Sequence, residues 1–206
     1  MDTSCLMLAC NLLTPISLGS IFLDDDLKDT GIELDSHITI LYAQGKLIDK
    51  TEIIKKIGPR YISYIQGLAK DEYYPAVFDL FELSSFSNES DYVILKLKDS
   101  TELYQKLKWL NSELSKIYSV KSEFGSYKPH LTLAELKPGK AEKYLKSDTL
   151  QKVLKDSAFK PEDFIISYGT SGETNYIQYD LTHNKSVDRV FRVRDLQRDL
   201  DILRND

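Results

Sequence analysis

Hydrophobic and polar residues alternate along several short stretches of the chain, which predicts β-strands whose successive side chains point to opposite faces. Two of these stretches are separated only by the polar turn Ser87–Ser90, and the last two by residues 169–175, so each pair predicts a hairpin. The predicted strands are residues 5–11, 36–43, 77–86, 92–97, 130–136, 164–168 and 176–181.

Between the strands, hydrophobic residues recur every three or four positions, which predicts amphipathic helices. Asp99 and Glu102 are in position to cap the clearest of them. Residues 14–22 and 140–155 predict shorter helices, and the polar residues 23–35 predict a loop. The helical stripes are Leu103, Leu107, Leu110, Leu114 and Ile117 in the clearest helix, Ile53, Ile54 and Ile57 in a helix that starts at Asp49, and Ile62, Ile65 and Leu68 in one that follows Pro59.

The order of these elements predicts the fold class. Runs of strands interrupted by helices are typical of an α+β (mixed α/β) fold in which helices cover the outer faces of antiparallel sheets. The chain divides into two halves, each with strands and its own helices, as expected for two similar lobes that face a central cleft. Because no linker composition interrupts residues 1–183, we expect them to form one domain.

Residues 184–206 differ from the rest, because Arg and Asp dominate them. They predict an amphipathic C-terminal helix that either folds back on its own domain or packs against a second subunit to form a homo-oligomer. Its apolar stripe is Val193, Leu196, Leu200 and Leu203.

One short pattern occurs twice: His, an apolar residue, then Thr, inside a predicted strand. His37 and Thr39 share one face of the first strand, and His130 and Thr132 share one face of the second. A single His beside a Thr is usually only a satisfied, partly buried pair. The repetition favours a site: imidazoles exchange protons near neutral pH, and hydroxyls can hold phosphate oxygens.

These two motif regions resemble the two-histidine (2H) phosphoesterase superfamily. The resemblance is greatest to phage enzymes of the anti-CBASS group, over Gly31–Tyr42 and Tyr127–Gly139, although Glu135 stands where those relatives often have Tyr. It implies a two-lobed fold and a metal-independent phosphodiesterase that opens cyclic di- or oligonucleotides to linear products. Such an enzyme would block host antiviral CBASS signalling in the host cytoplasm, with no cofactor.

Without the resemblance, the residues indicate only that the substrate is a phosphodiester, with a nucleotide as the expected kind. A 2H enzyme acting on RNA 2′,3′-cyclic phosphates or 2′-5′ oligoadenylate, a sponge that binds cyclic nucleotides without cutting them, and a purely structural sheet protein remain alternatives. Lys128 is in phase with His130 and is a candidate for substrate binding. Tyr127 is a candidate for stacking on a base, or for packing.

The composition of the chain limits the kinds of partner that we expect it to bind. The formal net charge of -5 argues against binding of long nucleic acids, which need a basic surface. No apolar run is long enough to cross a bilayer, and the spacing of the histidines and acidic residues provides no metal site. Cys5 and Cys10 fall on opposite faces of one strand, so we expect them not to pair, as in a reducing cytoplasm.

Five lysines surround the second motif. They are either a solvated surface or a funnel that attracts an anionic substrate. They are Lys128, Lys137, Lys140, Lys143 and Lys146.

Overall fold

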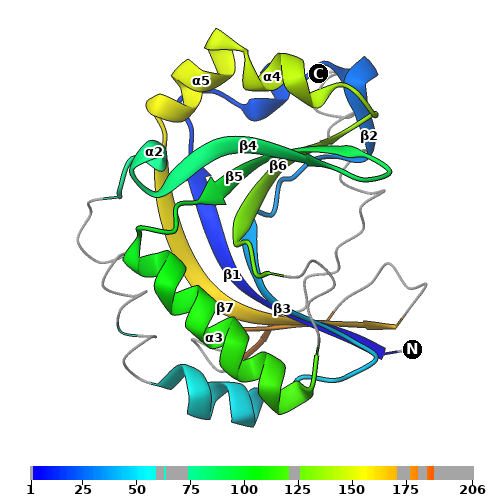
Figure 1. The fold of residues 1–206 in the computed structure, drawn as a ribbon, viewed down its shortest axis with the longest axis vertical. Coiled ribbons are helices and arrows are strands. Elements are labelled where there is room, and N and C mark those ends of the chain that lie inside the picture. Colours follow the sequence, from blue (N-terminus) through cyan, green and yellow to red (C-terminus); the bar gives the residue numbers. More distant parts are fainter. Residues whose placement is uncertain are drawn as a thin grey trace.

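The computed structural model describes residues 2–58, 63, 74–120, 126–170, 177–180 and 185–187 of the chain. Within these residues the strands form one antiparallel sheet in the order β4-β5-β6-β3-β1-β7-β8-β9, and β2 pairs with β6 (Figure 1). The strands are β1 (Asp2–Leu13), β2 (Leu27–Ile32), β3 (His37–Gln44), β4 (Phe81–Ser87), β5 (Asp91–Leu97), β6 (His130–Leu136), β7 (Ala158–Thr170), β8 (Ile177–Asp180) and β9 (Lys185–Val187).

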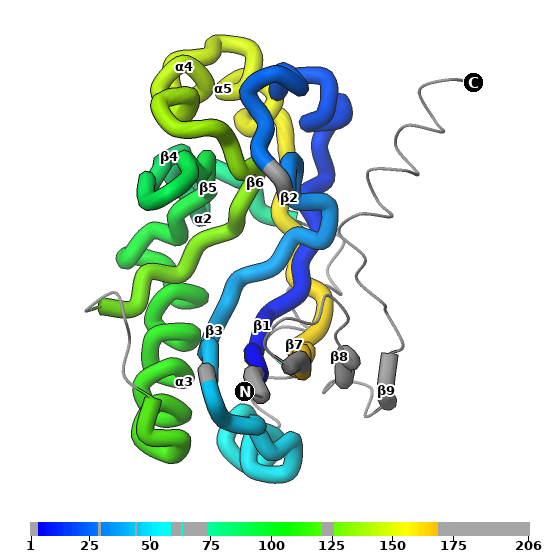
Figure 2. Tube along the Cα trace, turned by 90° about the vertical axis from the view of Figure 1, so that its right-hand side faces the viewer, coloured from blue at the N-terminus to red at the C-terminus, as the bar shows by residue number. Residues whose placement is uncertain are grey.

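Helices accompany the sheet, so the predicted α+β class is confirmed. Figures 1 and 2 show α3 alongside the lower part of β3 and α4 with α5 at the far end of the molecule, near β4 and β5. The helices are the short 3-10 turns η1 (Leu18–Ser20) and η2 (Asp24–Asp26), and α2 (Val77–Leu80), α3 (Glu102–Tyr118), α4 (Ala141–Leu145) and α5 (Asp148–Lys155), with residues 50–58 also helical.

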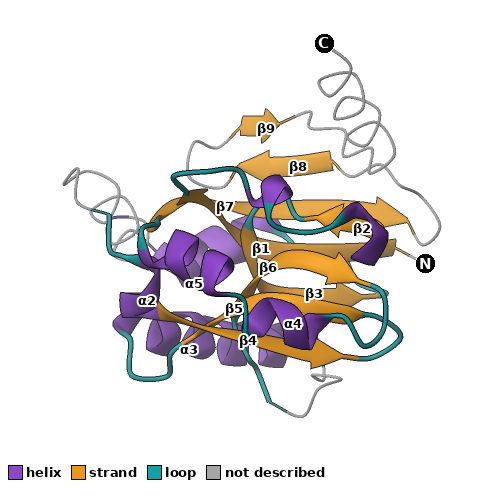
Figure 3. Ribbon diagram, turned by 90° about the horizontal axis from the view of Figure 1, so that it is seen from above, coloured by secondary structure: helices purple, strands orange, loops and turns teal. Residues whose placement is uncertain are grey.

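The core lies where the apolar faces of the strands meet the helices. Figure 3 shows from above how the helices lie along the sheet. Burying these side chains supplies the main favourable free energy of folding, at roughly 25 cal/mol per Å² of apolar surface. The strand residues at its centre are Leu6, Leu8, Ile38, Ile40, Val93, Leu95, Leu97, Leu131 and Leu133, each no more than 1% exposed.

The clearest predicted helix is confirmed as α3, with two corrections. Its N-cap is Thr101, whose hydroxyl accepts a hydrogen bond from the Tyr104 N–H at 3.2 Å, rather than Asp99 or Glu102. At its C-terminal end Ile117 is 38% exposed and Tyr118 is buried instead. The buried stripe passes from Leu114 to Tyr118, four positions later, because residues four apart lie on the same side of a helix with 3.6 residues per turn.

Two other predictions were wrong. Residues 77–80 form α2 rather than the start of a strand, since a short apolar run suits either element and here the Val77 N–H bonds to the Ser157 carbonyl at 3.0 Å. The predicted loop over residues 23–35 contains η2 and β2. Strand β2 is polar and forms by pairing with β6, a tertiary interaction that has no local hydrophobic signal.

The end of the chain extends the sheet further than expected. Strand β9 pairs with β8 and includes Lys185–Val187, beyond the expected domain boundary at residue 183. The C-terminal helix expected over residues 184–206 is wrong at Lys185–Val187, which form β9, and its other residues lie outside the described part of the chain, as do most of the residues expected to form a helix after Pro59. Cys5 and Cys10 are both free thiols, as predicted. No helix among the described residues has both the length and the apolar character to cross a membrane.

Candidate functional site

The structure brings the two His-x-Thr motifs together, because β3 and β6 are antiparallel neighbours. Ile38 lies opposite Leu131 in the register of these strands, and both side chains are completely buried. The antiparallel register therefore sets His37 across from Thr132, and Thr39 across from His130. All four polar side chains belong to the sheet face opposite the core, and each is half-buried.

Both motif strands contain a β-bulge at the residue that follows the threonine. Along β3, pairing with β1 passes from Leu41 to Thr39 and skips Ile40. Along β6, pairing with β5 passes from Ala134 to Thr132 and skips Leu133. A bulge adds local twist and redirects the neighbouring side chains, so the two motifs share a distortion as well as a sequence.

Helix α3 stabilises the bulge in the first motif. The Asn111 side-chain amide donates a hydrogen bond of 2.7 Å to the carbonyl oxygen of Ile40, the bulged residue. A bulged residue leaves the regular ladder, and its carbonyl needs another donor in a buried setting. Asn111 supplies that donor from the core side of the sheet.

The two imidazoles are held in the same way. The Nδ1 atom of His37 lies 2.8 Å from the carbonyl oxygen of Asp35, and that of His130 lies 2.8 Å from the carbonyl oxygen of Lys128. Because a carbonyl can only accept, each Nδ1 carries a proton and donates. The Nε2 atom of each ring is then left to accept a proton in the neutral form or to donate one in the charged form.

His130 is the histidine whose environment opposes a positive charge. Burial lowers the pKa of His130, and the nearby charge of His37 acts in the same direction, while the hydrogen bond to the Lys128 carbonyl opposes them in part. The edge of the His130 ring also meets the ring of Phe86, with centroids 5.4 Å apart and planes at 73°. His130 is therefore the histidine more suited to act as a neutral base.

Glu33 is an acidic residue near the first motif that the sequence analysis missed. Its Oε1 accepts a hydrogen bond from the Asp35 N–H at 3.3 Å, and its own N–H bonds to the Leu133 carbonyl at 3.0 Å. Burial raises the pKa of Glu33, and the charge of His37 lowers it in part, so the carboxyl group and the imidazole interact. No local pattern indicated this, because Glu33 is placed by the pairing of β2 with β6.

The Cys5 thiol, which adjoins Thr39, does not suit nucleophilic chemistry. Burial raises the pKa of Cys5 to about 12, and a hydrogen bond with the Thr39 side chain only partly opposes this shift. The thiolate is the reactive form of cysteine, and it is scarce near neutral pH at such a pKa. Among the described residues, the two imidazoles and the Glu33 carboxyl group are then the acid-base groups beside the motifs.

Of the two candidate substrate-binding residues, Tyr127 has its hydroxyl engaged. It donates a hydrogen bond of 2.9 Å to the Thr39 carbonyl, and its ring packs against the core. Lys128 is exposed, and its carbonyl holds His130. It also lines a hollow of about 240 Å³ beside the start of β6, together with Lys96, Leu97, Asp99, Tyr104, Lys108, Ser126, Tyr127 and Pro129.

Four of the five lysines around the second motif have other partners. Lys140 and Lys143 form ion pairs with Asp26, the first at 3.4 Å. Lys146 pairs with Glu142 at 2.5 Å, and the Lys137 ammonium donates to the Asp25 carbonyl at 2.7 Å. These contacts support the solvated, structural interpretation for those four lysines. Two lysines lie close to His130: Lys128, whose carbonyl holds its ring, and Lys96, which lies opposite His130 in the pairing of β5 with β6.

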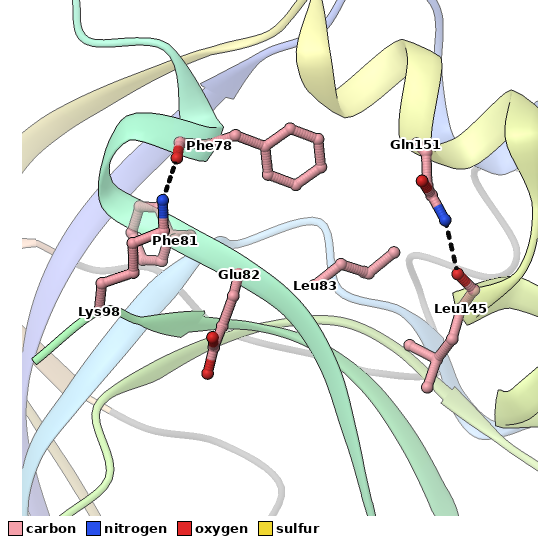
Figure 4. A pocket seen from close by; sticks show the side chains of 7 residues that line it. All are labelled: Phe78, Phe81, Glu82, Leu83, Lys98, Leu145 and Gln151. Atoms are coloured by element: carbon pink, nitrogen blue, oxygen red, sulfur yellow. Dashed lines mark hydrogen bonds between the residues drawn. The ribbon is translucent and has the colours of Figure 1, made fainter.

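Another hollow, of about 370 Å³, lies away from the motifs, between β4 and the helices α2, α4 and α5 (Figure 4). Its charged side chains are already bonded: Lys98 donates to the Phe78 carbonyl, and Glu82 pairs with Lys96 at 2.6 Å. Among the described residues, no group of three or more His, Cys, Asp or Glu side chains could hold a metal ion. Among the described residues, the two His-x-Thr motifs are therefore the candidate catalytic site.

Comparison with known proteins assigns no family, since the chain matches no family model and no curated protein matches it.

Proposed function

We propose that the protein is a phosphodiesterase whose two His-x-Thr motifs act together on one phosphate. The observation that carries the proposal is the common orientation of the imidazoles: each Nδ1 donates to the carbonyl two residues earlier, at 2.8 Å, on adjoining strands. The same bond therefore fixes both rings, on two neighbouring strands. Two rings held this way direct two Nε2 atoms to proton transfer.

In the proposed reaction His130 is the base and His37 the acid. A water molecule or a ribose 2′-hydroxyl attacks phosphorus, and Nε2 of neutral His130 takes its proton. The bond to the leaving oxygen breaks, and Nε2–H of charged His37 protonates that oxygen. The Glu33 carboxylate and the charged ring of His37 attract one another. The hydroxyls of Thr39 and Thr132 hold the non-bridging oxygens, on which negative charge increases in the transition state.

This division of roles needs no metal ion, because the histidines transfer the protons and the threonines hold the charged oxygens. The narrow junction of β3 and β6, described by the pair Ile38 and Leu131, fits two lobes that meet at the site. We propose that these are the lobes of a 2H phosphoesterase fold.

The proposed substrate is a cyclic di- or oligonucleotide, opened at a 3′-5′ bond to a linear product. The motif regions support this choice through their resemblance to phage anti-CBASS enzymes, which would place the activity in the host cytoplasm, against antiviral signalling. A compact ligand also suits a protein of net charge -5 better than a long nucleic acid does.

A substrate panel tests the proposal. The protein is incubated with cyclic dinucleotides, cyclic trinucleotides, RNA ending in a 2′,3′-cyclic phosphate and 2′-5′ oligoadenylate, with and without excess EDTA, and the products are separated by chromatography. We expect linear products from a cyclic oligonucleotide, at the same rate in EDTA. Cleavage of the RNA or the oligoadenylate alone would assign a different 2H substrate. Binding without any product would indicate a sponge, and a rate that requires an added divalent ion would refute the metal-free mechanism.

A further inference from the structure

An exposed aromatic ring lies directly beside the proposed base. Phe86, on β4, is 40% exposed, and its ring meets the His130 imidazole at a centroid distance of 5.4 Å. Strand β4 is at the end of the sheet order, where exposed edges usually carry charged or polar side chains. A large apolar side chain exposed at this place calls for an explanation.

Phe86 is supported by a series of contacts that ends at a buried carboxylate. Its ring stacks on Tyr92 of β5, with centroids 4.7 Å apart and planes at 18°. The Tyr92 hydroxyl donates to Glu135 Oε1 at 3.0 Å, and Glu135 is only 8% exposed. The orientation of the Phe86 ring therefore depends on the interior of the protein.

Glu135 is itself fixed on several sides. Its carboxylate accepts hydrogen bonds from Ser90, at 2.6 Å, and from Thr30, and it lies 3.8 Å from the Lys28 ammonium. A carboxylate satisfied in this way holds its position. The residue at which the second motif departs from its phage relatives thus supports the aromatic pair.

We propose that the exposed face of Phe86 is the stacking surface for the nucleobase adjoining the phosphate at His130. This inference depends on the proposed function, because it assumes a nucleotide phosphodiester at the two histidines. Bases stack on aromatic side chains regardless of sequence, since every base has a π-face. Phe86 would then distinguish nucleotides from simpler phosphodiesters and place the phosphate against His130.

Binding of a fluorescent cyclic dinucleotide tests the stacking. One base of cyclic di-AMP is replaced by 2-aminopurine, whose emission is quenched when it stacks, and the protein has the His37→Ala change so that the ligand stays intact. We expect Phe86→Ala and Phe86→Leu to weaken binding about 5- to 100-fold and to abolish the quenching. Phe86→Trp should retain both. Trp109→Ala, which removes an aromatic ring 44% exposed on α3, is the control and should change neither.

A ligand lacking one base separates stacking from a purely structural role. Phe86→Ala should not weaken binding of a cyclic dinucleotide in which the 2-aminopurine is replaced by hydrogen. Equal weakening for both ligands, or full binding by the Phe86→Leu variant, would overturn the stacking role. If the wild-type protein cleaves nothing in the substrate panel, the proposed function is wrong. Quenching that depends on Phe86 would even then support Phe86 as the stacking surface for a nucleobase. A protein that neither cleaves nor binds these ligands would overturn both.

Discussion

The hydroxyl of Tyr127 donates a hydrogen bond of 2.9 Å to the backbone carbonyl of Thr39. Tyr127 precedes the second motif strand, and Thr39 belongs to the first, so a side chain joins the two motifs in addition to the backbone pairing of β3 with β6. Burial raises the pKa of Tyr127 well above its usual range, so the phenol remains a donor near neutral pH.

We expect Tyr127→Phe to reduce the free energy of unfolding by about 0.5 to 1.5 kcal/mol, the usual net contribution of such a hydrogen bond. We also expect kcat to fall by about tenfold, since small displacements of catalytic groups are costly. The matched control is Tyr168→Phe, which removes a phenol bond of 2.9 Å to the Ile48 carbonyl outside the motifs. Urea unfolding and steady-state kinetics distinguish the two variants. Equal kcat values would reject the positioning role of Tyr127.

The two histidines should act as one unit. We expect His37→Ala and His130→Ala each to lower kcat by about 10²- to 10⁴-fold, the usual contribution of a general acid or base. The double variant should be scarcely slower than either single one, because acid and base serve the same transition state. Single-turnover rates on the cleaved substrate measure this, with circular dichroism to check folding. Wild-type activity in either single variant would remove that histidine from the mechanism.

The pH dependence of the rate follows from the different environments. His130 must be neutral, and burial lowers its pKa, so the acidic limb of kcat/KM should have its midpoint below about pH 6.5, the value of an ordinary histidine. The rate should fall again at alkaline pH, where the acid has lost its proton. A rate profile measured from pH 4 to 10 decides this, and an acidic midpoint above about pH 7 would contradict the assignment of His130 as base.

Glu33 offers a separate test of the acid. Glu33→Gln removes a negative charge that attracts the charged ring of His37, so kcat should fall while the acidic limb of the profile, set by His130, stays in place. Glu142→Gln, which changes an exposed carboxylate paired with Lys146 on α4, is the control. A shift of the acidic limb alone in Glu33→Gln would exchange the roles of the two histidines.

The motif strands could be predicted from the sequence because their signal is local. The predicted strand over residues 130–136 matches β6 at both ends, and α3 follows its apolar stripe. The alternation of side chains also correctly put His37 and Thr39 on the face opposite Ile38. What brings the motifs together is the antiparallel neighbour relation of β3 and β6, which depends on distant parts of the chain.

Other parts of the site could not be predicted for the same reason. Glu33 is placed by β2, a polar strand that forms only by pairing with β6. Phe86 was recognised only as a strand residue, since its contact with His130 joins β4 to β6 across β5. The lysines near the second motif were counted by proximity in sequence, whereas Asp26 engages two of them from another element.

Asp26, directly before β2, joins the start of that strand to α4, and β2 in turn pairs with the second motif strand. Its carboxylate forms ion pairs with Lys143 and Lys140 and accepts a hydrogen bond of 2.7 Å from the Tyr144 hydroxyl. The Tyr144 oxygen in turn accepts from the Leu23 N–H at 2.9 Å. These bonds, the one from Lys143 foremost, lower the pKa of Asp26 to about 2.

We expect Asp26→Asn to reduce the free energy of unfolding by about 1 to 2 kcal/mol at pH 7, from its depressed pKa. The ordinary pKa of aspartate in an unfolded chain is about 3.9, so the contribution is complete above that pH and is lost as the pH falls towards 2. The difference between wild type and variant in urea unfolding should therefore be present at pH 7 and absent at pH 2. Glu142→Gln, which breaks the exposed pair with Lys146, should show no measurable change, because exposed ion pairs add little. A difference for Asp26→Asn that persists undiminished at pH 2 would show that the ion pairs are not its source.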